Sequence, residues 1–578
     1  MIGGMTATHT DGAVASEPAP RHPLAVASLI EKHAATIAKA DAAIADRGYW
    51  SHFPESPSPK VYGETAAADG QAAFETYLGG RFPLEQPGAT GWVATERSPF
   101  GVALGVEYPH SDVETLVTAA TAAMPAWRDA GPDARTAVCV EILTRIHEHV
   151  FELANAVQFT TGQAFVMAFQ AGGPHALDRA LESVAYAHTE MKRHPATADW
   201  EKPAGKGDPL RMSKTFHVVP RGIGLVIGCN TFPTWNSYPG LFASLATGNA
   251  VIVKPHPLAV LPLAITVKYA REVLAEAGFD PDLVQLAPEA EGEKIASTLA
   301  LRPEVKIVDF TGSTQYGDWL EQNAHQASVY TEKAGVNTIV VDSTDDFVGM
   351  CRNVAFSLTL YSGQMCTTPQ NILVPRDGID TESGHIGFDE VAAGIAGAVA
   401  KLVGDDARAV ELTGAIVNDG VVSRIGAARS HGEVLLDSRE VKHPAFPDAV
   451  VRTPLILKQD SANEGMFDSE WFGPISFVVA TDSTAQSLEI FRRIVGKKGA
   501  LTAAVYSTDE SVLDAMEDAT LDVGVHLSCN LTGGVFVNQS AAFSDFHASG
   551  ANAAANSALT DGAYVSNRFR IVQSRRHI

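Results

Sequence analysis

The sequence has few cysteines and no long apolar run. Its five cysteines lie far apart, and none forms a CxxC pair or the Cys/His spacing of a metal site. We therefore expect reduced thiols in a cytoplasmic protein without a metal centre. The most apolar stretch, residues 248–267, contains Lys254, His256 and three prolines, which argues against a membrane span. No basic region followed by an apolar stretch opens the chain, so we expect no secretory signal.

Basic residues are also scarce. The chain has 43 Lys and Arg against 67 Asp and Glu, a formal net charge of −24 at pH 7. This balance argues against general binding of nucleic acid or of an anionic membrane, although it leaves room for a local basic pocket that holds a phosphorylated cofactor. The arginines of the C-terminal tail are expected to be solvated or to contact another subunit: Arg568, Arg570, Arg575 and Arg576.

Apolar residues make up 46% of the 578 residues, enough for the cores of two or three domains. Residues 1–23 are rich in Ala, Thr and Pro, which predicts a disordered leader. A helical pattern runs from about residue 23 to 47, and the remainder of an extension over residues 24–97 is rich in Pro and Gly, which is typical of irregular chain laid over a folded body. Residues 113–190 carry apolar side chains at helical spacing.

Short apolar runs alternate with helical patterns over residues 224–332. The runs GLVIGC, AVIVKP, LVQLA, VKIVDF and ASVYTE predict five strands with four helices between them. Such a succession requires a parallel sheet with crossover helices, the usual architecture for binding a dinucleotide. A second α/β unit is predicted over residues 337–522, with strands in NTIVVD, QNILV, PLILK, ISFVVA and LTAAVYS, and the tail alternates like an edge strand.

Cys366 and Glu332 are the residues most indicative of chemistry. They lie 34 residues apart, in the runs YSGQMCTTPQN and YTEKAGVNTIVVD. A thiol can form a covalent adduct with a carbonyl group, and a carboxylate can activate the water that releases it. For a cysteine and a glutamate taken alone, a buried free thiol and a surface carboxylate would be the commoner explanation.

Other candidate residues follow predicted strands, where open α/β sheets bind their ligands. Gly312, Ser313 and Gly317 belong to FTGSTQYG, a turn that opens a helix and suits a phosphate, although such turns are common in α/β proteins. Lys254 ends the second strand and Asn230 follows the first, where either residue could also be solvated or cap a helix.

Further along the chain, FDSEWFGPISFVV has the pattern E-x-F-G-P, which contains Glu470 and Phe472. Taken alone, this segment is equally compatible with a helix-to-strand turn around a buried phenylalanine.

The chain resembles the aldehyde dehydrogenase superfamily from about residue 98 to the C-terminus. Six local motifs occur in the same order as in that family, and they contain Asn230, Lys254, Gly312, Glu332, Cys366 and Glu470. The resemblance implies the aldehyde dehydrogenase fold, with a Rossmann-like cofactor domain, an α/β catalytic domain and a small β oligomerisation arm. It places the cofactor domain at residues 98–332, with an arm hairpin at about 192–216. The catalytic domain would cover 333–535, and residues 536–578 would return to the cofactor domain and end in the arm.

The same resemblance implies a role for each residue. Cys366 attacks the aldehyde, while the Asn230 side chain and the Cys366 backbone N–H hold the oxyanion. Glu332 activates the water that hydrolyses the thioester, and a helix N-terminus after Cys366 together with the cofactor's charge would lower the pKa of the thiol.

The cofactor would be held by Lys254 at its ribose, by Glu470 and Phe472 near the nicotinamide ribose, and by the FTGST loop at its phosphates. Many NAD-preferring members have a glutamate three residues after the lysine, whereas this chain has Pro257. We therefore expect NADP or NAD as cofactor, with NADP used at least as well, and His256 as a possible partner of a 2′-phosphate.

Two departures from common members concern the segments EKAGV after Glu332 and FSDFHASG at residues 543–550, and both suggest an unusual substrate mouth. We expect that mouth to be walled by aromatic side chains: Phe232, Trp235, Tyr238, Phe543 and Phe546.

Residues 47–70 and the run QPGATGWVATERSPFGVALGVEYP resemble the phenylacetic acid degradation branch PaaN. That branch implies oxidation of a CoA-linked semialdehyde from a ring-opened compound by a homodimer or homotetramer, with ring opening left to another polypeptide. A CoA-acylating dehydrogenase and a non-catalytic subunit of a phenylacetate pathway complex are the alternatives.

Overall fold

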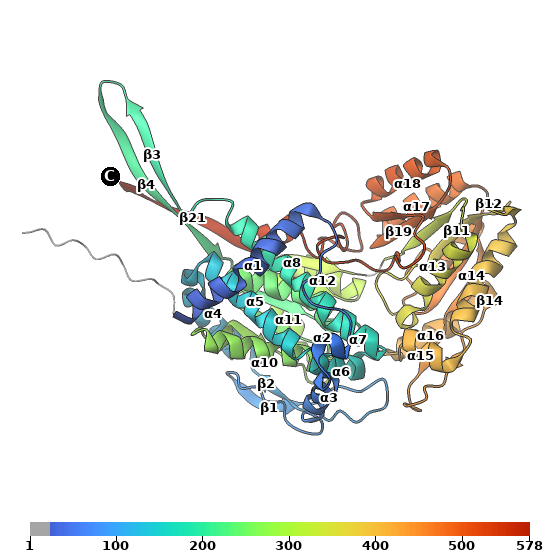
Figure 1. Ribbon diagram of the computed structural model, residues 1–578, viewed down its shortest axis with the longest axis horizontal. Coiled ribbons are helices and arrows are strands. Elements are labelled where there is room, and N and C mark those ends of the chain that lie inside the picture. Colours follow the sequence, from blue (N-terminus) through green and yellow to red (C-terminus); the bar gives the residue numbers. More distant parts are fainter. Residues whose placement is uncertain (1–23, 334) are drawn as a thin grey trace, which may run out of the picture.

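The computed structural model describes residues 24–333 and 335–578, so the predicted leader lies outside the described residues (Figure 1). A five-stranded parallel sheet has the order β7-β6-β5-β8-β9. Its strands are β5 (Ile223–Ile227), β6 (Val251–Lys254), β7 (Val284–Leu286), β8 (Val305–Thr311) and β9 (Ser328–Glu332). All five strands were predicted from the sequence, and the order reverses between β5 and β8, which is where such sheets bind their ligands.

Helices cover this sheet, and its three central strands β5, β6 and β8 are largely buried on both faces. The four crossover helices lie where the sequence predicts them: α9 (Pro233–Ala246), α10 (Leu261–Glu276), α11 (Ile295–Ala300) and α12 (Thr314–Asn323). The helical region before the sheet forms α4 (Val113–Ala130), α5 (Pro132–Glu148), α6 (Val150–Thr161), α7 (Phe165–Gly172) and α8 (Pro174–Met191).

A second sheet of seven strands has the order β14-β17-β18-β11-β10-β19-β20, parallel except for β14. Its predicted strands are β10 (Thr338–Val341), β11 (Asn371–Pro375), β17 (Leu455–Asp460), β18 (Ile475–Thr481) and β19 (Thr502–Tyr506). The edge strands β14 (Glu433–Leu436) and β20 (His526–Cys529) were not predicted, because each is only four residues long and all of these residues are exposed or partly exposed.

The helices of this second unit are α13 (Phe347–Thr359), α14 (Phe388–Leu402), α15 (Asp406–Leu412), α16 (Asp419–Ala428), α17 (Thr484–Lys498) and α18 (Glu510–Val523). Two small hairpins pair β12 (Ile379–Thr381) with β13 (Gly384–Ile386) and β15 (Glu440–Val441) with β16 (Val451–Arg452). Together with the seven strands, these helices form a second α/β unit beside the first sheet (Figure 1).

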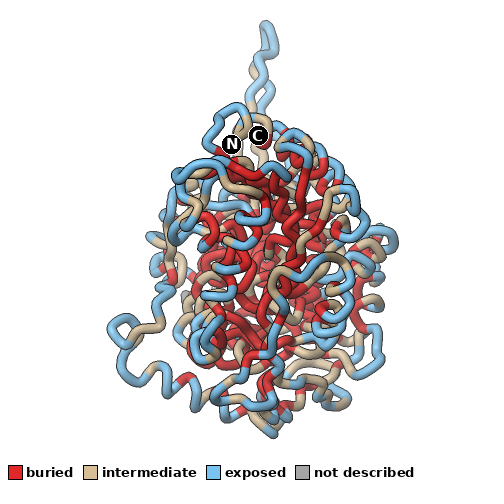
Figure 2. Tube along the Cα trace, turned by 90° about the vertical axis from the view of Figure 1, so that its right-hand side faces the viewer, coloured by how far each residue is buried: buried red, intermediate tan, exposed pale blue. Residues whose placement is uncertain are grey.

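An antiparallel arm of three strands projects from the body. It contains β3 (Thr197–Ala204), β4 (Gly207–Pro220) and β21 (Phe569–His577), in the order β21-β4-β3. Figure 2 shows the tip of this arm exposed, while the buried chain is concentrated in the body. The tail therefore forms an edge strand of the arm, as its sequence alternation predicts.

The extension lies against the helical face of the body. Its first helix, α1 (Leu24–Asp46), packs on α5 and α8. It continues through α2 (Pro59–Tyr62), α3 (Ala66–Glu75) and β1 (Ala89–Val93), which pairs with β2 (Tyr108–Ser111). A Cβ atom on Gly70 would lie 2.3 Å from Cβ of Phe151, so α3 reaches α6 only because this residue is glycine.

Over the described ranges, no helix combines the length and apolarity that a membrane crossing needs.

Arg568 is not a solvated tail residue, which corrects the expectation from the sequence. It follows α19 (Gly562–Ser566) and is fully buried. Its guanidinium donates to Asp309 Oδ1 at 2.6 Å and to Oδ2 at 2.8 Å, and the Tyr564 hydroxyl donates to the same carboxylate at 2.7 Å. Because Asp309 lies on β8, this ion pair anchors the C-terminal strand to the first sheet.

We predict that Arg568→Leu lowers the stability of the fold by about 3 to 5 kcal/mol, because the buried Asp309 carboxylate loses its partner. The midpoint of urea denaturation, followed by intrinsic fluorescence, measures the change. Arg570→Leu is the matched control, since Arg570 lies two residues further along with an exposed side chain, and its effect should stay within about 0.5 kcal/mol. Equal midpoints for the two variants would contradict this account of the anchor.

Candidate functional site

Cys366 lies on a strained turn between α13 and β11. The turn begins with a short 3-10 segment, Leu360–Gly363, in which Tyr361 and Ser362 have φ values of 53° and 51°. A Cβ atom on Gly363 would lie 2.6 Å from the carbonyl oxygen of Gly473, so no other residue fits there. Non-glycine residues in this region cost energy and persist only when neighbouring contacts fix them. The chain runs from Cys366 through a turn into β11, so the helix expected after the thiol is absent from this described segment.

Two buried amide side chains fix this turn. Gln364 donates to the carbonyls of Tyr361 and Ala415 at 3.3 and 3.1 Å, and its oxygen accepts from Val417 N at 3.0 Å. Asn337 donates to the carbonyl of Cys366 at 2.7 Å and accepts from the backbone N–H groups that open β19 at 3.0 and 3.1 Å. The backbone at Cys366 is therefore tied to the strand beside it.

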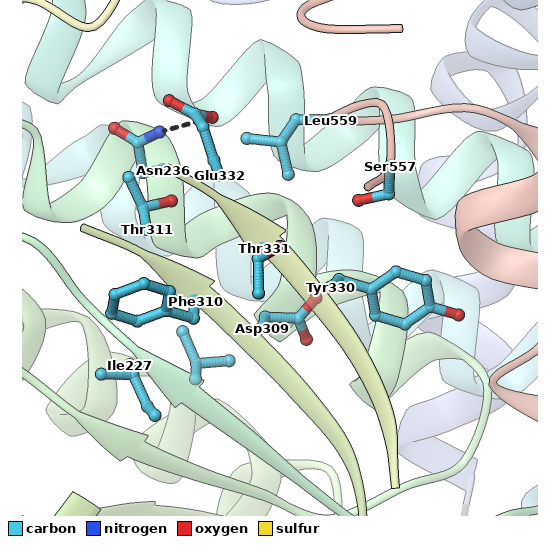
Figure 3. A pocket seen from close by; sticks show the side chains of 11 residues that line it. Ile227, Asn236, Asp309, Phe310, Thr311, Tyr330, Thr331, Glu332, Ser557 and Leu559 are labelled. Atoms are coloured by element: carbon cyan, nitrogen blue, oxygen red, sulfur yellow. Dashed lines mark hydrogen bonds between the residues drawn. The ribbon is translucent and has the colours of Figure 1, made fainter. Parts of the chain in front are cut away.

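Glu332 ends β9 of the five-stranded sheet, and its side chain lies close to Cys366. Its side chain is 3% exposed, and its Oε2 accepts from Asn236 Nδ2 at 3.3 Å and from His547 Nε2 at 3.2 Å. Figure 3 shows Asn236 and Glu332 meeting at the end of the strand. Oε1 is buried and has no hydrogen-bond partner within the part of the chain that the structure describes. Ligand atoms of Glu332, Cys366 and His547 all lie within 4.8 Å of one another.

The electrostatics assign the resting proton to the thiol. Burial raises the pKa of Cys366 well above its usual value, and the Glu332 carboxylate raises it further. Burial alone would raise the pKa of Glu332 too, but the charge of His547 and the hydrogen bonds of His547, Cys366 and Asn236 together outweigh it, so that pKa lies below its usual value. The pair is therefore a protonated thiol beside an ionised base until a positive charge or a reacting carbonyl group arrives.

Asn230 and Cys229 follow β5 in a loop. Asn230 is partly exposed, and its side chain makes no recorded hydrogen bond with the described residues. Cys229 is buried, with Thr231 Oγ1 at 3.8 Å and Asn236 Oδ1 at 3.7 Å from its sulfur, and burial raises its pKa. The amide of Asn230 is therefore available to a ligand, whereas Cys229 is enclosed.

A pocket at Cys366 is also lined by Glu470 and Phe472, so residues about a hundred positions apart in the sequence meet at the thiol. Burial raises the pKa of Glu470 to about 7, against the backbone hydrogen bond from Gly335 and the charge of Arg424. Arg424 also donates to the carbonyl of Phe472 at 2.8 Å, which holds this loop against the pocket.

The glycine turn after β8 has two parts with different roles. Gly312 and Ser313 are exposed just before α12, and the Ser313 side chain accepts from Tyr316 N as the helix cap. Gly317 is buried inside α12, where a Cβ atom would lie 2.6 Å from the Lys333 side chain. Gly312 and Ser313 are open to a phosphate, whereas Gly317 serves helix packing.

Lys254 ends β6 and is nearly fully buried, and its Nζ forms an ion pair with Glu289, which follows β7. His256 accepts from Leu258 N at 3.1 Å, and burial lowers the pKa of His256 to about 4, assisted by the charge of Lys254. At neutral pH the imidazole is therefore uncharged. Lys254 therefore does have a carboxylate beside it. That carboxylate belongs to Glu289, after β7, and not to position 257.

The aromatic residues expected at the mouth have different positions. Tyr238 and Phe543 are fully buried, Tyr238 against Phe242 and Phe543 against Trp50 of the extension. Both belong to the core, which corrects the expectation for them. Phe546 is exposed and lies under the Arg47 guanidinium, 3.9 Å from its ring centre.

The other two aromatic residues join an apolar cluster around Cys229. Its members are Cys229, Phe232, Tyr361, Met167, Ala171, Trp235 and Met365. Because Met365 directly precedes the nucleophile, we take this cluster as the apolar side of the approach to the thiol.

Four residues of the site escaped the sequence prediction: Asn236, Glu289, Asn337 and His547. Each contacts a predicted residue from a different segment, and no local motif marks them. The only signal was His547 itself, a titratable residue within the departure FSDFHASG.

Comparison with known proteins agrees with this geometry. The aldehyde dehydrogenase family profile matches residues 105–563. The structure superposes with a TM-score of 0.94 on an NAD-dependent aldehyde dehydrogenase from Burkholderia multivorans, at 63% identity over 95% of this chain and 99% of that chain. A 1-pyrroline-5-carboxylate dehydrogenase from Thermus with bound NAD shares the fold, with a TM-score of 0.69 at 20% identity over 92% of this chain and 99% of that one.

Among curated relatives, an N-succinylglutamate 5-semialdehyde dehydrogenase from Yersinia pseudotuberculosis is 25% identical over 386 residues, 66% of this chain and 71% of that protein. The family match covers most of the chain and includes Cys366, Glu332 and the cofactor-type sheet. The chain therefore belongs to the aldehyde dehydrogenase family.

Proposed function

We propose that the protein oxidises an aldehyde to a carboxylic acid with NAD, through a thioester on Cys366. The observation that carries this proposal is the meeting of Cys366 with the buried, ionised Glu332 at the ends of the two sheets. A thiol alone would form an adduct with the aldehyde, and the carboxylate supplies the base that later releases the product.

In this mechanism, Cys366 Sγ gives up its proton to solvent and bonds to the aldehyde carbon, and the new oxyanion is held by the Asn230 amide and the Cys366 backbone N–H. Bound NAD would supply the hydride acceptor for that carbon, so that the carbonyl group would re-form as a thioester on Cys366. Glu332 then takes a proton from water as the water oxygen bonds to the thioester carbon. The C–S bond breaks, and the thiol is regenerated with the acid as product.

The residues of the first sheet suit the cofactor. Gly312 and Ser313 are exposed where a phosphate needs backbone N–H groups, Lys254 and Glu289 lie at the ends of β6 and β7, and Glu470 and Phe472 line the pocket at the thiol. The 63% identical relative from Burkholderia is described as NAD-dependent. We therefore assign the sites of Lys254, His256, Gly312, Ser313, Glu470 and Phe472 to NAD binding, with Gly317 supporting the loop from within α12.

We infer a preference for NAD over NADP, the opposite of the preference that Pro257 alone predicts. Glu289 places a carboxylate beside Lys254, where it would accept hydrogen bonds from ribose hydroxyls and repel a 2′-phosphate. His256 is neutral at pH 7 and offers no compensating charge.

Water is the better acceptor for the acyl group than CoA. An acylating enzyme has no need of a base at the thioester, whereas here Glu332 is held beside the thiol with one oxygen unengaged by any described group. A non-catalytic subunit of a phenylacetate complex would have no use for this arrangement either.

For the substrate, we propose a CoA-linked semialdehyde from a ring-opened aromatic acid, within the PaaN branch. The extension that resembles this branch packs on the segment that precedes His547: Arg47 covers Phe546, and Trp50 covers Phe543. The apolar cluster beside the thiol suits a long carbon chain, and a curated relative is a semialdehyde dehydrogenase. We further propose that the protein works in the cytoplasm, where Cys366 stays reduced, as a homodimer or homotetramer joined through the projecting arm.

We predict that Glu289→Gln raises the ratio of kcat/KM for NADP to that for NAD by about 10- to 100-fold, because repulsion of a 2′-phosphate costs about 1 to 3 kcal/mol. Steady-state assays with both cofactors measure the ratio. Glu293→Gln is the matched control, since Glu293 follows four residues later and pairs with His110. A wild-type enzyme that uses NADP as well as NAD would contradict this role of Glu289.

We predict that a CoA-linked, medium-length semialdehyde has a kcat/KM at least about 100-fold higher than that of acetaldehyde. Remote binding energy and burial of each CH₂, worth about 0.8 kcal/mol, would position the reacting carbonyl group. Formation of NADH by purified enzyme measures both rates. Equal efficiencies would refute the pathway assignment. They would not contradict the oxidation chemistry at Cys366.

A further inference from the structure

His547 occupies a position from which it acts on the base of the reaction. It lies in the irregular segment after β20 and is 4% exposed. Its Nε2 is 3.2 Å from Glu332 Oε2, its Nδ1 is 3.5 Å from Ser540 Oγ, and its ring meets Trp235 edge to face at 4.6 Å. These contacts fix the ring on three sides.

The hydrogen-bond chemistry assigns the proton of the imidazole. An ionised carboxylate only accepts hydrogen bonds, so His547 Nε2 must carry the hydrogen that faces Glu332. Asn236 donates to the same oxygen, Oε2. The two oxygens of Glu332 are therefore unequal, because Oε2 has two donors and the buried Oε1 has none among the residues that the structure describes.

We propose that His547 is the positioning residue of the general base, because it keeps Glu332 ionised through Oε2 and leaves Oε1 to take the proton of the hydrolytic water. In that step the water oxygen bonds to the thioester carbon and its proton moves to Oε1. The C–S bond then breaks, and the proton returns from Glu332 to the Cys366 sulfur. This inference rests on the proposed function.

The surroundings support a role that depends on charge. The ionisable groups around Glu332 and His547 are the thiols of Cys366 and Cys229, while Arg179 reaches Ser540 at 3.0 Å and lies over Trp235 at 5.6 Å. Lys333, although adjacent in sequence, turns away to Asp318 and Glu321. Among the described residues, His547 is therefore the titratable nitrogen group that directly meets the carboxylate.

The segment that carries His547 is itself fixed from outside the site. Arg179 donates to the carbonyl of Asp545 at 2.8 Å and shares the buried Glu182 with Arg47 of the extension. The extension therefore helps to hold the histidine in place, which links its packing to the chemistry.

The test uses p-nitrophenyl acetate, an ester that acylates the thiol without cofactor. The burst of nitrophenolate counts the acylated sites, and the following steady rate reports thioester hydrolysis, so the result does not depend on the natural aldehyde. A base works above its pKa, and loss of His547 leaves only the hydrogen bonds of Cys366 and Asn236 to oppose the burial of Glu332, which moves that pKa upward. In the pH profile of hydrolysis, His547→Ala should therefore shift the acidic limb to higher pH by about one unit. The hydrolysis rate at pH 6 should fall about tenfold, and the burst should stay unchanged.

His547→Gln keeps a donor without the charge and should give a smaller shift, while His526→Gln, whose ring stacks on Phe546, should give none. A rate lowered by one constant factor at every pH would overturn the proposal, because it would indicate a purely structural role. Loss of wild-type hydrolysis on adding EDTA would also overturn it, because Cys366, Glu332 and His547 would then serve as metal ligands. The unchanged burst shows that each variant is folded.

Discussion

A carboxylate buried beside a thiol is the interaction on which the remainder of the site depends. Burial opposes the charge of Glu332, and the charge of His547 together with hydrogen bonds from His547, Cys366 and Asn236 holds its pKa below the usual value. Burial and the charge of Glu332 in turn keep the thiol of Cys366 protonated at rest. On the proposed function, the thiol stays unreactive until a positive charge or a reactive carbonyl group arrives.

Two sheets must meet at fixed positions for this contact to exist. Glu332 ends the last strand of the first sheet, whereas Cys366 sits on a strained turn before the second strand of the other unit, tied by Asn337 to β19. The C-terminal segment then crosses back, brings His547 to Glu332, and is anchored by Arg568 on Asp309. The extension packs on that segment through Arg47 and Trp50, so distant parts of the chain support one carboxylate.

The sequence predicts the elements of both sheets because buried parallel strands such as VKIVDF are continuous apolar runs with helical patterns between them. It also offers Cys366 and Glu332 as candidates, since each lies in a recognisable local run, and the structure brings these two side chains together. It misses Glu289 and His547, because their roles come from contacts across 35 and 215 positions of the chain. It likewise mistakes Arg568 for a solvated residue, because a lone arginine in an alternating tail carries no local sign of a buried partner.

The most direct measurement of the central claim is rapid mixing of Glu332→Gln with aldehyde and NAD, followed by acid quenching and peptide mass mapping. The account predicts a burst of about one NADH per site and an acyl group that accumulates on the peptide containing Cys366, since hydride transfer does not need the base but hydrolysis does. An acyl group on Cys229, or the absence of the burst, would contradict the assignment of Cys366 as nucleophile and Glu332 as the base for hydrolysis.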